Sequence, residues 1–347
     1  MRGRNSAAGF TPNRRILKAM VRMTVLASGS KGNSTLVASS RTRLLVDAGL
    51  SCREIFKRMR AMGESIEDLD AILITHEHQD HVQGLAVTAR KLGIPVYFTE
   101  ATHRAWMRWM TPRKRLTYAE WLEQQKAMTA AGKEPASDGD EAQDAAQEER
   151  EELTLDLAAA AQSKAELEAP EPSKPEKDPC ELPGVEYFRA GADFCIGDIA
   201  VRPFTIPHDA VDPVGFVFEV EGVRLGFATD LGYIPPNVHA HLKKCDVLLL
   251  EANHDVDMLR DGPYPWSVKQ RVMSRVGHLS NAAAADFLEN SYDGQAAYVV
   301  LAHLSESNNM PELARVAAEQ ALRNHMSLLA NKLLLAEQHA PLDPIVL

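Results

Sequence analysis

The 347-residue sequence contains only four cysteines, and Cys52, Cys180, Cys195 and Cys245 form no C-x-x-C pair. This spacing excludes a disulfide framework, argues against a purely structural zinc site and fits a reducing cytoplasm. A run of about 18 apolar residues is also lacking, so we expect no membrane-spanning helix. The basic N-terminus lacks the apolar core of a secretory signal. We expect a flexible arm over residues 1–22, or sequence upstream of a start near Met20 or Met23, on a cytoplasmic protein.

Charge is unevenly distributed along the chain. The net charge is −10, but residues 116–181 hold 18 acidic and six basic side chains, whereas the first 22 residues hold six basic and no acidic ones. The acidic stretch is rich in Ala, Glu, Pro and Ser, and it cannot bury enough apolar area to offset the entropy of ordering it. We therefore expect a mostly disordered acidic insertion over residues 113–181. It is either a tolerated surface loop or an acidic tether for a basic partner.

Short strands and helices are expected on both sides of the insertion. Before it, strands are expected at 23–27, 34–39, 43–49, 70–75 and 94–99, with helices at 51–63 and 82–93. After it, strands are expected at 199–207, 214–230, 245–253 and 296–304, with helices at about 265–276, 281–290 and from Pro311. The stretch 214–230 is a hairpin that turns at Glu221–Gly222. The simplest architecture for these elements is α+β, a four-layer αββα sandwich built from residues 23–112 and 182–330. We expect a C-terminal tail at 331–347.

Histidine and aspartate side chains follow the expected strands where each strand ends. The set comprises Asp47, His76, His78, Asp80, His81, His208, Asp230 and His303. A loop residue facing water explains any single one, but strand ends at one sheet edge converge, so together they predict a site. Neutral imidazole and carboxylate are ligands of Zn²⁺ and also suit Mn²⁺ or Fe. Eight such groups exceed what one tetrahedral ion needs, so we expect two divalent ions.

The motif THEHQDH resembles the H-x-H-x-D-H signature of the metallo-β-lactamase superfamily of dinuclear hydrolases. The segments LASGSKGNST, LLVDAGLS, PHDAVDPVGF, TDLGY, LEANHD and GHLSN look more narrowly like the YycJ/WalJ (VicX) family, whose members are regarded as 5′-to-3′ DNA exonucleases. The layout is also similar to tRNase Z, which hydrolyses a phosphodiester. The resemblance covers about residues 23–110 and 182–325.

The resemblance implies a role for each site position. The ligands would be His76, His78 and His208 for one ion and Asp80, His81 and His303 for the other, with Asp230 bridging. Asp47 would orient a ligand imidazole or the attacking water. Asp230 stands where a dizinc lactamase with a cysteine ligand has Cys, which favours phosphodiester or thioester hydrolysis over lactam chemistry.

The tRNase Z-like arrangement implies three catalytic residues, Asp80, His278 and Glu251. His278 would donate a proton to the leaving alkoxide, and Glu251 would hold its tautomer. Phosphodiester hydrolysis needs such a donor because a sugar alkoxide is a poor leaving group. The alternative is that His278 is simply a residue before a helix that Ser280 caps.

Two short polar segments hold candidate substrate contacts. The Gly-rich turn at residues 28–34 can offer groups to a phosphate, with Ser30 and Asn33 as candidates, although a plain tight turn has the same sequence. Asn253 and His254 follow Glu251 and are further candidates, with a hydrogen-bonded loop as the alternative.

The sequence therefore predicts a dinuclear metal-dependent hydrolase of phosphodiesters, first of all a 5′-to-3′ DNA exonuclease with DNA as its substrate partner. A metal-bridging hydroxide would attack phosphorus, and His278 would protonate the leaving group. One alternative is hydrolysis of a small thioester, lactone or cyclic phosphodiester. A non-catalytic metal-bound scaffold is disfavoured because no ligand position is lost. The only dense basic patch near the folded part is residues 107–115.

Overall fold

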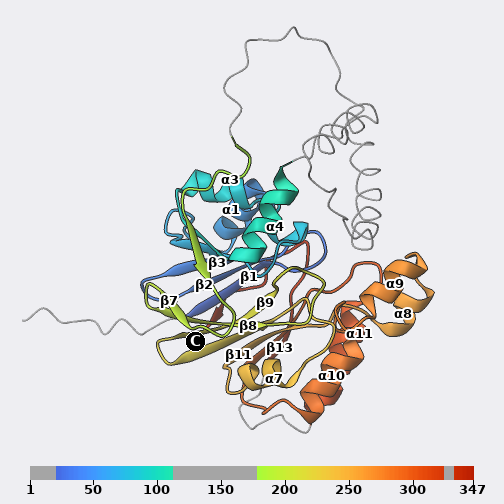
Figure 1. Cartoon of the computed structure of the whole chain (residues 1–347). Helices are drawn as coiled ribbons and strands as arrows, with labels where there is room; N and C mark the ends of the chain where they lie inside the picture. Colours follow the sequence, from blue (N-terminus) through green and yellow to red (C-terminus); the bar gives the residue numbers. More distant parts are fainter. Residues whose placement is uncertain (1–20, 112–177, 324–331) are drawn as a thin grey trace, which may run out of the picture. The chain divides into compact units, whose positions relative to one another are not determined.

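The computed structural model describes residues 21–111, 178–323 and 332–347 (Figure 1). Nearly all of the acidic insertion and of the N-terminal arm, with the disorder predicted for them, lies outside these residues. The described strands form two seven-stranded sheets. The order in the first is β14 (Ile345–Val346), β1 (Arg22–Ala27), β2 (Ser34–Ala38), β3 (Arg43–Val46), β4 (Ala71–Leu73), β5 (Val96–Thr99) and β6 (Val185–Phe188). The order in the second is β13 (Lys332–Leu335), β12 (Tyr298–Ala302), β11 (Val247–Glu251), β10 (Val223–Ala228), β9 (Val214–Val220), β8 (Ile199–Thr205) and β7 (Phe194–Ile196).

The two sheets pack face to face through an apolar core. Side chains alternate between the two faces of each strand, so one strand serves two layers. In β11, Val247 and Leu249 lie in the core between the sheets, whereas Leu248 and Leu250 lie in the cluster under the helices. This explains why central strands such as β11 are apolar on both faces.

Helices cover the outer faces of both sheets (Figure 1). The first sheet is covered by α1 (Cys52–Ala61), α3 (Leu85–Leu92) and α4 (Glu100–Met110). The second is covered by α7 (Pro236–Leu242), α10 (Asn281–Asn290) and α11 (Pro311–Leu322). The expected αββα sandwich is confirmed. In the described part of the chain, no helix combines the length and the apolar character needed to span a membrane.

Two expected elements differ from the structure. The helix expected at 82–93 is divided into α2 (Gln79–Val82) and α3. A Cβ atom on Gly84 would lie 2.0 Å from the carbonyl oxygen of Leu50, so the chain turns there to pass close to a neighbouring loop. The C-terminal segment, expected as a tail, holds β13 and β14, which pair with β12 and β1. Two strands of four and two residues carry too little periodicity to be recognised in a sequence.

Strand direction places the polar loops together. Strands β3, β4 and β5 are parallel in the first sheet, and β10, β11 and β12 are parallel in the second. The carboxyl ends of parallel neighbours lie at the same edge of a sheet, where loops build sites. This edge carries the side chains that the sequence singled out.

Candidate metal centre and active site

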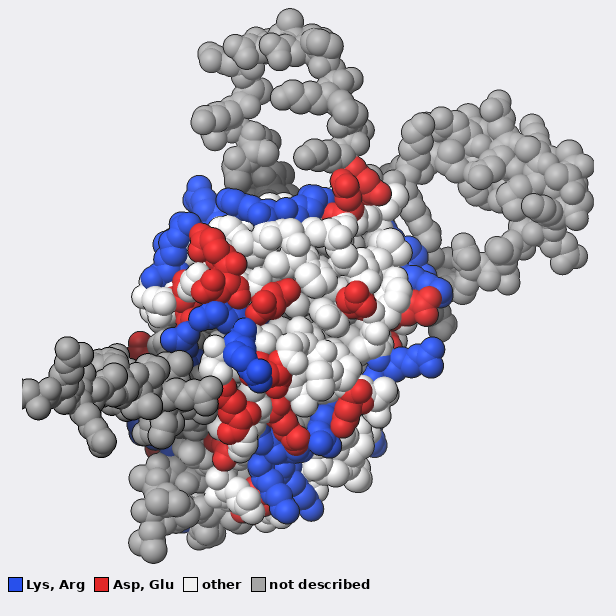
Figure 2. Space-filling view, turned by 90° about the vertical axis from the view of Figure 1, so that its left-hand side faces the viewer, with Lys and Arg blue, Asp and Glu red and all other residues white. Residues whose placement is uncertain are grey.

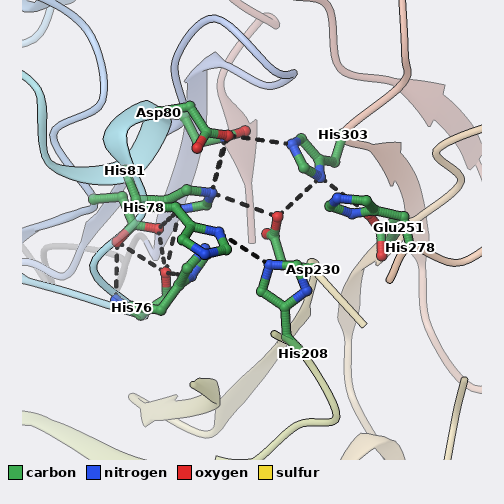
Figure 3. A network of polar contacts seen from close by, with 12 residues as sticks. His76, His78, Asp80, His81, His208, Asp230, Glu251, His278 and His303 are labelled. Carbon is green, nitrogen blue, oxygen red and sulfur yellow. Dashed lines mark hydrogen bonds and ion pairs between the residues drawn. The ribbon is translucent and has the colours of Figure 1, made fainter. Parts of the chain in front are cut away.

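Two groups of histidine and aspartate side chains meet at the strand ends (Figure 3). The three-imidazole cluster consists of His76, His78 and His208. The mixed cluster consists of Asp80, His81, Asp230 and His303. Within each cluster the candidate ligand atoms lie within 4.8 Å of one another. Figure 3 shows Asp230 between the two groups, and this grouping is the one that the family resemblance implies.

The backbone conformation of three of these residues directs their side chains toward the site. Asp47, Asp230 and His303 directly follow or nearly follow β3, β10 and β12, and their φ angles are 60°, 60° and 55°. This left-handed region is uncommon for residues other than glycine, and such strain concentrates at functional sites. The sharp turn after each strand directs the side chain across the strand ends rather than into solvent. All three residues are at least 96 % buried.

The three-imidazole cluster has nitrogen atoms that lack protein partners. His208 Nδ1 lies 3.1 Å and 3.2 Å from the carbonyl oxygens of Val276 and Gly277, to which it donates, so Nε2 keeps its lone pair. That Nε2 lies 3.2 Å from Nδ1 of His78. His76 Nε2 is buried and has no hydrogen-bond partner. Buried nitrogen lone pairs that converge in this way fit a bound cation.

Burial sets the charge of this cluster. Desolvation, together with the nearby charges of His81 and His78, lowers the pKa of His76 well below its usual value. Desolvation lowers the pKa of His208 to about 4. Both rings are therefore neutral at neutral pH, which is the form that binds a metal ion.

The mixed cluster contains its own counter-charges. Asp230 Oδ1 lies 3.0 Å from His303 Nδ1 and 3.5 Å from His81 Nε2. Burial alone would raise the pKa of Asp230, but the charges of His303 and His81 outweigh it and lower this pKa well below the usual value. Burial would lower the pKa of His81, but Asp80, Asp230 and Asp47 raise it well above the usual value. His303 Nε2 is buried without a hydrogen-bond partner.

Asp47 orients one ring of the mixed cluster. His81 Nδ1 donates to its Oδ2 at 2.8 Å, which leaves Nε2 directed toward Asp230. Thr75 donates to the same carboxylate through its backbone N–H and its hydroxyl, both at 2.9 Å. Thr75 Oγ1 also lies 3.0 Å from His76 Nδ1. The sequence analysis did not identify Thr75, although its place directly before the H-x-H-x-D-H motif was a usable signal.

Glu251 links the mixed cluster to His278. Its Oε1 lies 2.7 Å from His278 Nδ1 and 3.0 Å from His303 Nδ1, while Oε2 accepts from the backbone N–H groups of Leu231 and Leu279. Burial would raise the pKa of Glu251, but the charge and hydrogen bonds of His278, then of His303, lower it to about 2. An ionised Glu251 fixes the proton of His278 on Nδ1. The expected cap of the following helix is present, since Ser280 Oγ accepts from Ala283 N–H.

The four candidate substrate contacts lie in different surroundings. Ser30 is exposed at the tip of its turn, whereas Asn33 is buried and its amide donates to Asp80 Oδ2 at 3.0 Å. Asn253 is buried and donates to the carbonyl oxygen of His303 at 2.9 Å. His254 is buried, and its Nδ1 has no hydrogen-bond partner. Asn33 and Asn253 thus donate hydrogen bonds to residues of the mixed cluster. A direct substrate contact stays a prediction for all four residues.

Known proteins resemble this chain over most of its length. The family model described as "Metallo-beta-lactamase superfamily" matches residues 27–303. The chain is 33 % identical over 298 residues to the exodeoxyribonuclease YycJ of Bacillus anthracis, covering 86 % of this chain and 88 % of that one. It is 32 % identical over 292 residues to the exodeoxyribonuclease WalJ of Streptococcus pneumoniae, covering 84 % of each.

Solved structures share the fold at low sequence identity. The metallo-beta-lactamase fold protein YhfI from Bacillus subtilis superposes with a TM-score of 0.56 at 13 % identity, covering 94 % of this chain and 99 % of that one. The short form of human tRNase Z superposes with a TM-score of 0.50 at 15 % identity, covering 93 % of this chain and all of that one. Identities this low establish the fold alone.

Proposed function

Because this chain belongs to the metallo-beta-lactamase superfamily of hydrolases and, within it, to the family of YycJ and WalJ, we propose that it hydrolyses phosphodiester bonds of DNA as a 5′-to-3′ exonuclease. The observation that carries the proposal is the paired arrangement of Glu251 and His278 beside the two clusters. A thioesterase has less need of this pair, because its thiolate leaving group departs without a strong proton donor.

The clusters fit two divalent ions. His76 Nε2 and His303 Nε2 are buried polar atoms without hydrogen-bond partners, and a cation would satisfy both. His76, His78 and His208 would hold one ion, Asp80, His81 and His303 the other, and Asp230 would bridge them. Zn²⁺ suits this nitrogen and oxygen donor set, as do Mn²⁺ and Fe. When bound, such a pair would supply a nucleophilic hydroxide at neutral pH and offset the charge that develops on the phosphate.

The protein side chains supply the remaining steps. Asp47 and Thr75 keep His81 in the orientation that its ligand role requires. His278, with 20 % of its side chain exposed, reaches the open side of the centre, and its proton on Nε2 is available to the leaving 3′ oxygen. Glu251 stabilises the ring as it gives up and regains that proton.

The test is cleavage of end-labelled DNA and RNA by the purified full chain reconstituted with Zn²⁺ or Mn²⁺. We expect shortening of single-stranded DNA from its 5′ end, abolished in Asp80→Ala and strongly reduced in His278→Ala. A metal-loaded protein that leaves DNA and RNA intact but turns over a thioester or lactone would overturn the proposal.

A further inference from the structure

The guanidinium of Arg275 lies over an aromatic ring near the candidate metal centre. Its guanidinium carbon is 4.3 Å from the centre of the Tyr233 ring. The two residues come from different segments, since Tyr233 lies three positions after Asp230 and Arg275 three positions before His278. A three-residue segment spans at most about 10 Å, so the Cα atom of Tyr233 lies within that distance of Asp230, and that of Arg275 within that distance of His278.

Tight backbone packing holds the two segments together. A Cβ atom on Gly232 would lie 2.4 Å from the carbonyl carbon of Arg275 and 2.5 Å from its oxygen, so only glycine fits. The carbonyl oxygen of Val276 accepts from the backbone N–H of Asp209 at 2.9 Å and from His208 Nδ1. The backbone of Arg275 is therefore fixed relative to the three-imidazole cluster.

Arg275 differs from the nearby Arg260 and Arg271 in its ion pairing. Arg260 forms ion pairs with Asp257 and Asp261, and Arg271 forms one with Asp209. Arg275 is exposed and, within the part of the chain that the structure describes, forms no ion pair with a carboxylate. Stacking on Tyr233 orders the guanidinium without using its N–H donors. An ordered, unneutralised guanidinium at the rim of a site is suited to bind a phosphate.

One face of the molecule carries no continuous basic area (Figure 2). On the face shown in Figure 2, which is the side where β7 lies in Figure 1, Lys and Arg are interspersed with Asp and Glu. A polyanion therefore meets no continuous positive surface on that face.

We propose that Arg275, ordered by Tyr233, binds a backbone phosphate adjacent to the scissile one and so makes the site selective for a polynucleotide strand over a small phosphodiester. The inference rests on the proposed function and names a substrate contact for it. Val276, which is 44 % exposed next to Arg275, offers apolar surface to the sugar or base of the same nucleotide. The guanidinium contacts only phosphate, so single-stranded DNA and RNA would share this contact.

The experiment compares a single-stranded oligonucleotide with bis(p-nitrophenyl) phosphate, which has no neighbouring phosphate. For Arg275→Ala in the full metal-loaded chain, we expect kcat/KM for the oligonucleotide to fall about tenfold relative to the small diester, mainly through KM, because one charged contact is lost. The slope of log binding constant against log salt, from fluorescence anisotropy, should become shallower by about 0.7. Arg275→Lys should recover part of the affinity, since it keeps the charge without the planar stack.

Substitutions at Tyr233 distinguish the contribution of stacking from that of the Arg275 charge. Tyr233→Phe keeps the ring and should resemble the wild type, whereas Tyr233→Leu should show part of the Arg275→Ala defect. Arg41→Ala is the matched control. Arg41 is an exposed arginine between β2 and β3, at the ends of these strands opposite to Asp47, and it forms an ion pair with Asp198. Its substitution removes one positive charge far from the site.

If Arg275→Ala changes kcat/KM equally for the oligonucleotide and for the small diester, or changes neither, the inference is overturned. A defect of the same size in Arg41→Ala would overturn it too, because it would mean that net charge alone is responsible. If the wild type cleaves neither substrate, the proposed function fails. Strand binding by anisotropy then still decides the inference, because equal affinity of wild type and Arg275→Ala contradicts it and a tenfold loss supports it.

Discussion

The three-imidazole cluster and the mixed cluster lie side by side, but the pKa values of their buried histidines are shifted in opposite directions. Burial keeps His76 and His208 neutral by lowering the pKa of each ring. In the mixed cluster, carboxylates raise the pKa of His81 and His303, and the protonated rings lower the pKa of Asp80 and Asp230. One cluster offers uncharged lone pairs, and the other is internally neutralised until a cation replaces its protons.

This difference indicates which cluster depends more on hydrogen bonds from neighbouring side chains. A neutral imidazole needs only a backbone acceptor on its second nitrogen, and His208 finds two in Val276 and Gly277. A buried carboxylate needs several donors, because an uncompensated charge in the interior is costly. In the mixed cluster, Asn33 donates to Asp80, while Asp47 and Glu251 accept from the rings of His81 and His303 and so support their charge. We expect substitutions around the mixed cluster to change its metal affinity more than those around the three-imidazole cluster.

Asp230→Ala should have the largest effect, because this residue lies between the two clusters and is the one proposed to bridge both ions. We expect bound metal to fall below two ions per chain and DNA cleavage to fall by at least about 10³-fold, more than the loss of a single oxyanion donor. Elemental analysis and a cleavage assay measure the two effects. Retention of both ions with near-normal cleavage would show that Asp230 is not shared.

His278→Ala should come next, because our proposal assigns this residue the role of proton donor and not that of metal ligand. We expect DNA cleavage to fall by about 10²–10⁴-fold with bound metal unchanged. Cleavage of bis(p-nitrophenyl) phosphate should fall much less, since p-nitrophenolate leaves without protonation. Glu251→Gln should reproduce the pattern more weakly. Equal losses on both substrates would contradict a role in protonating the leaving group.

Asn33→Ala should affect the mixed cluster alone. Its amide donates to Asp80 Oδ2, and loss of such a supporting contact lowers metal affinity by about 10–100-fold. Titration with Zn²⁺ should therefore show one weakened site and one unaffected site. Asn290→Ala is the matched control, because Asn290 is exposed at the end of α10 and donates only to Asp286. Two weakened sites would mean that the clusters do not act separately.

A pH measurement on His254 should show the smallest effect. His254 shares the lowered pKa of the three-imidazole cluster without belonging to it, since burial lowers its pKa to about 4. A depressed histidine pKa contributes stability above about pH 6.5, which is lost as the pH falls toward the folded-state pKa. We expect His254→Asn to reduce the drop in unfolding free energy between pH 6.5 and 4 by up to about 3 kcal/mol. Parallel pH profiles by urea denaturation would contradict a neutral buried ring.

The sequence was sufficient for features that depend on local patterns. Apolar strands that end in His or Asp predicted both the sandwich and the edge where the polar residues gather, and the family assignment and hydrolase class are confirmed by the comparisons. Contacts between segments far apart in sequence could not be predicted. The amide of Asn33 reaches Asp80 across 47 positions, and Arg275 stacks on Tyr233 across three helices and a strand. No spacing rule encodes such contacts, because the fold alone brings them together.

The most direct test of the account is anomalous X-ray diffraction from crystals of the full chain grown with Zn²⁺ and measured at the zinc edge. We predict two peaks about 3.5–4 Å apart, one among His76, His78 and His208 and the other among Asp80, His81 and His303, with Asp230 between them. A single peak, or zinc bound elsewhere while both clusters stay empty, would contradict it.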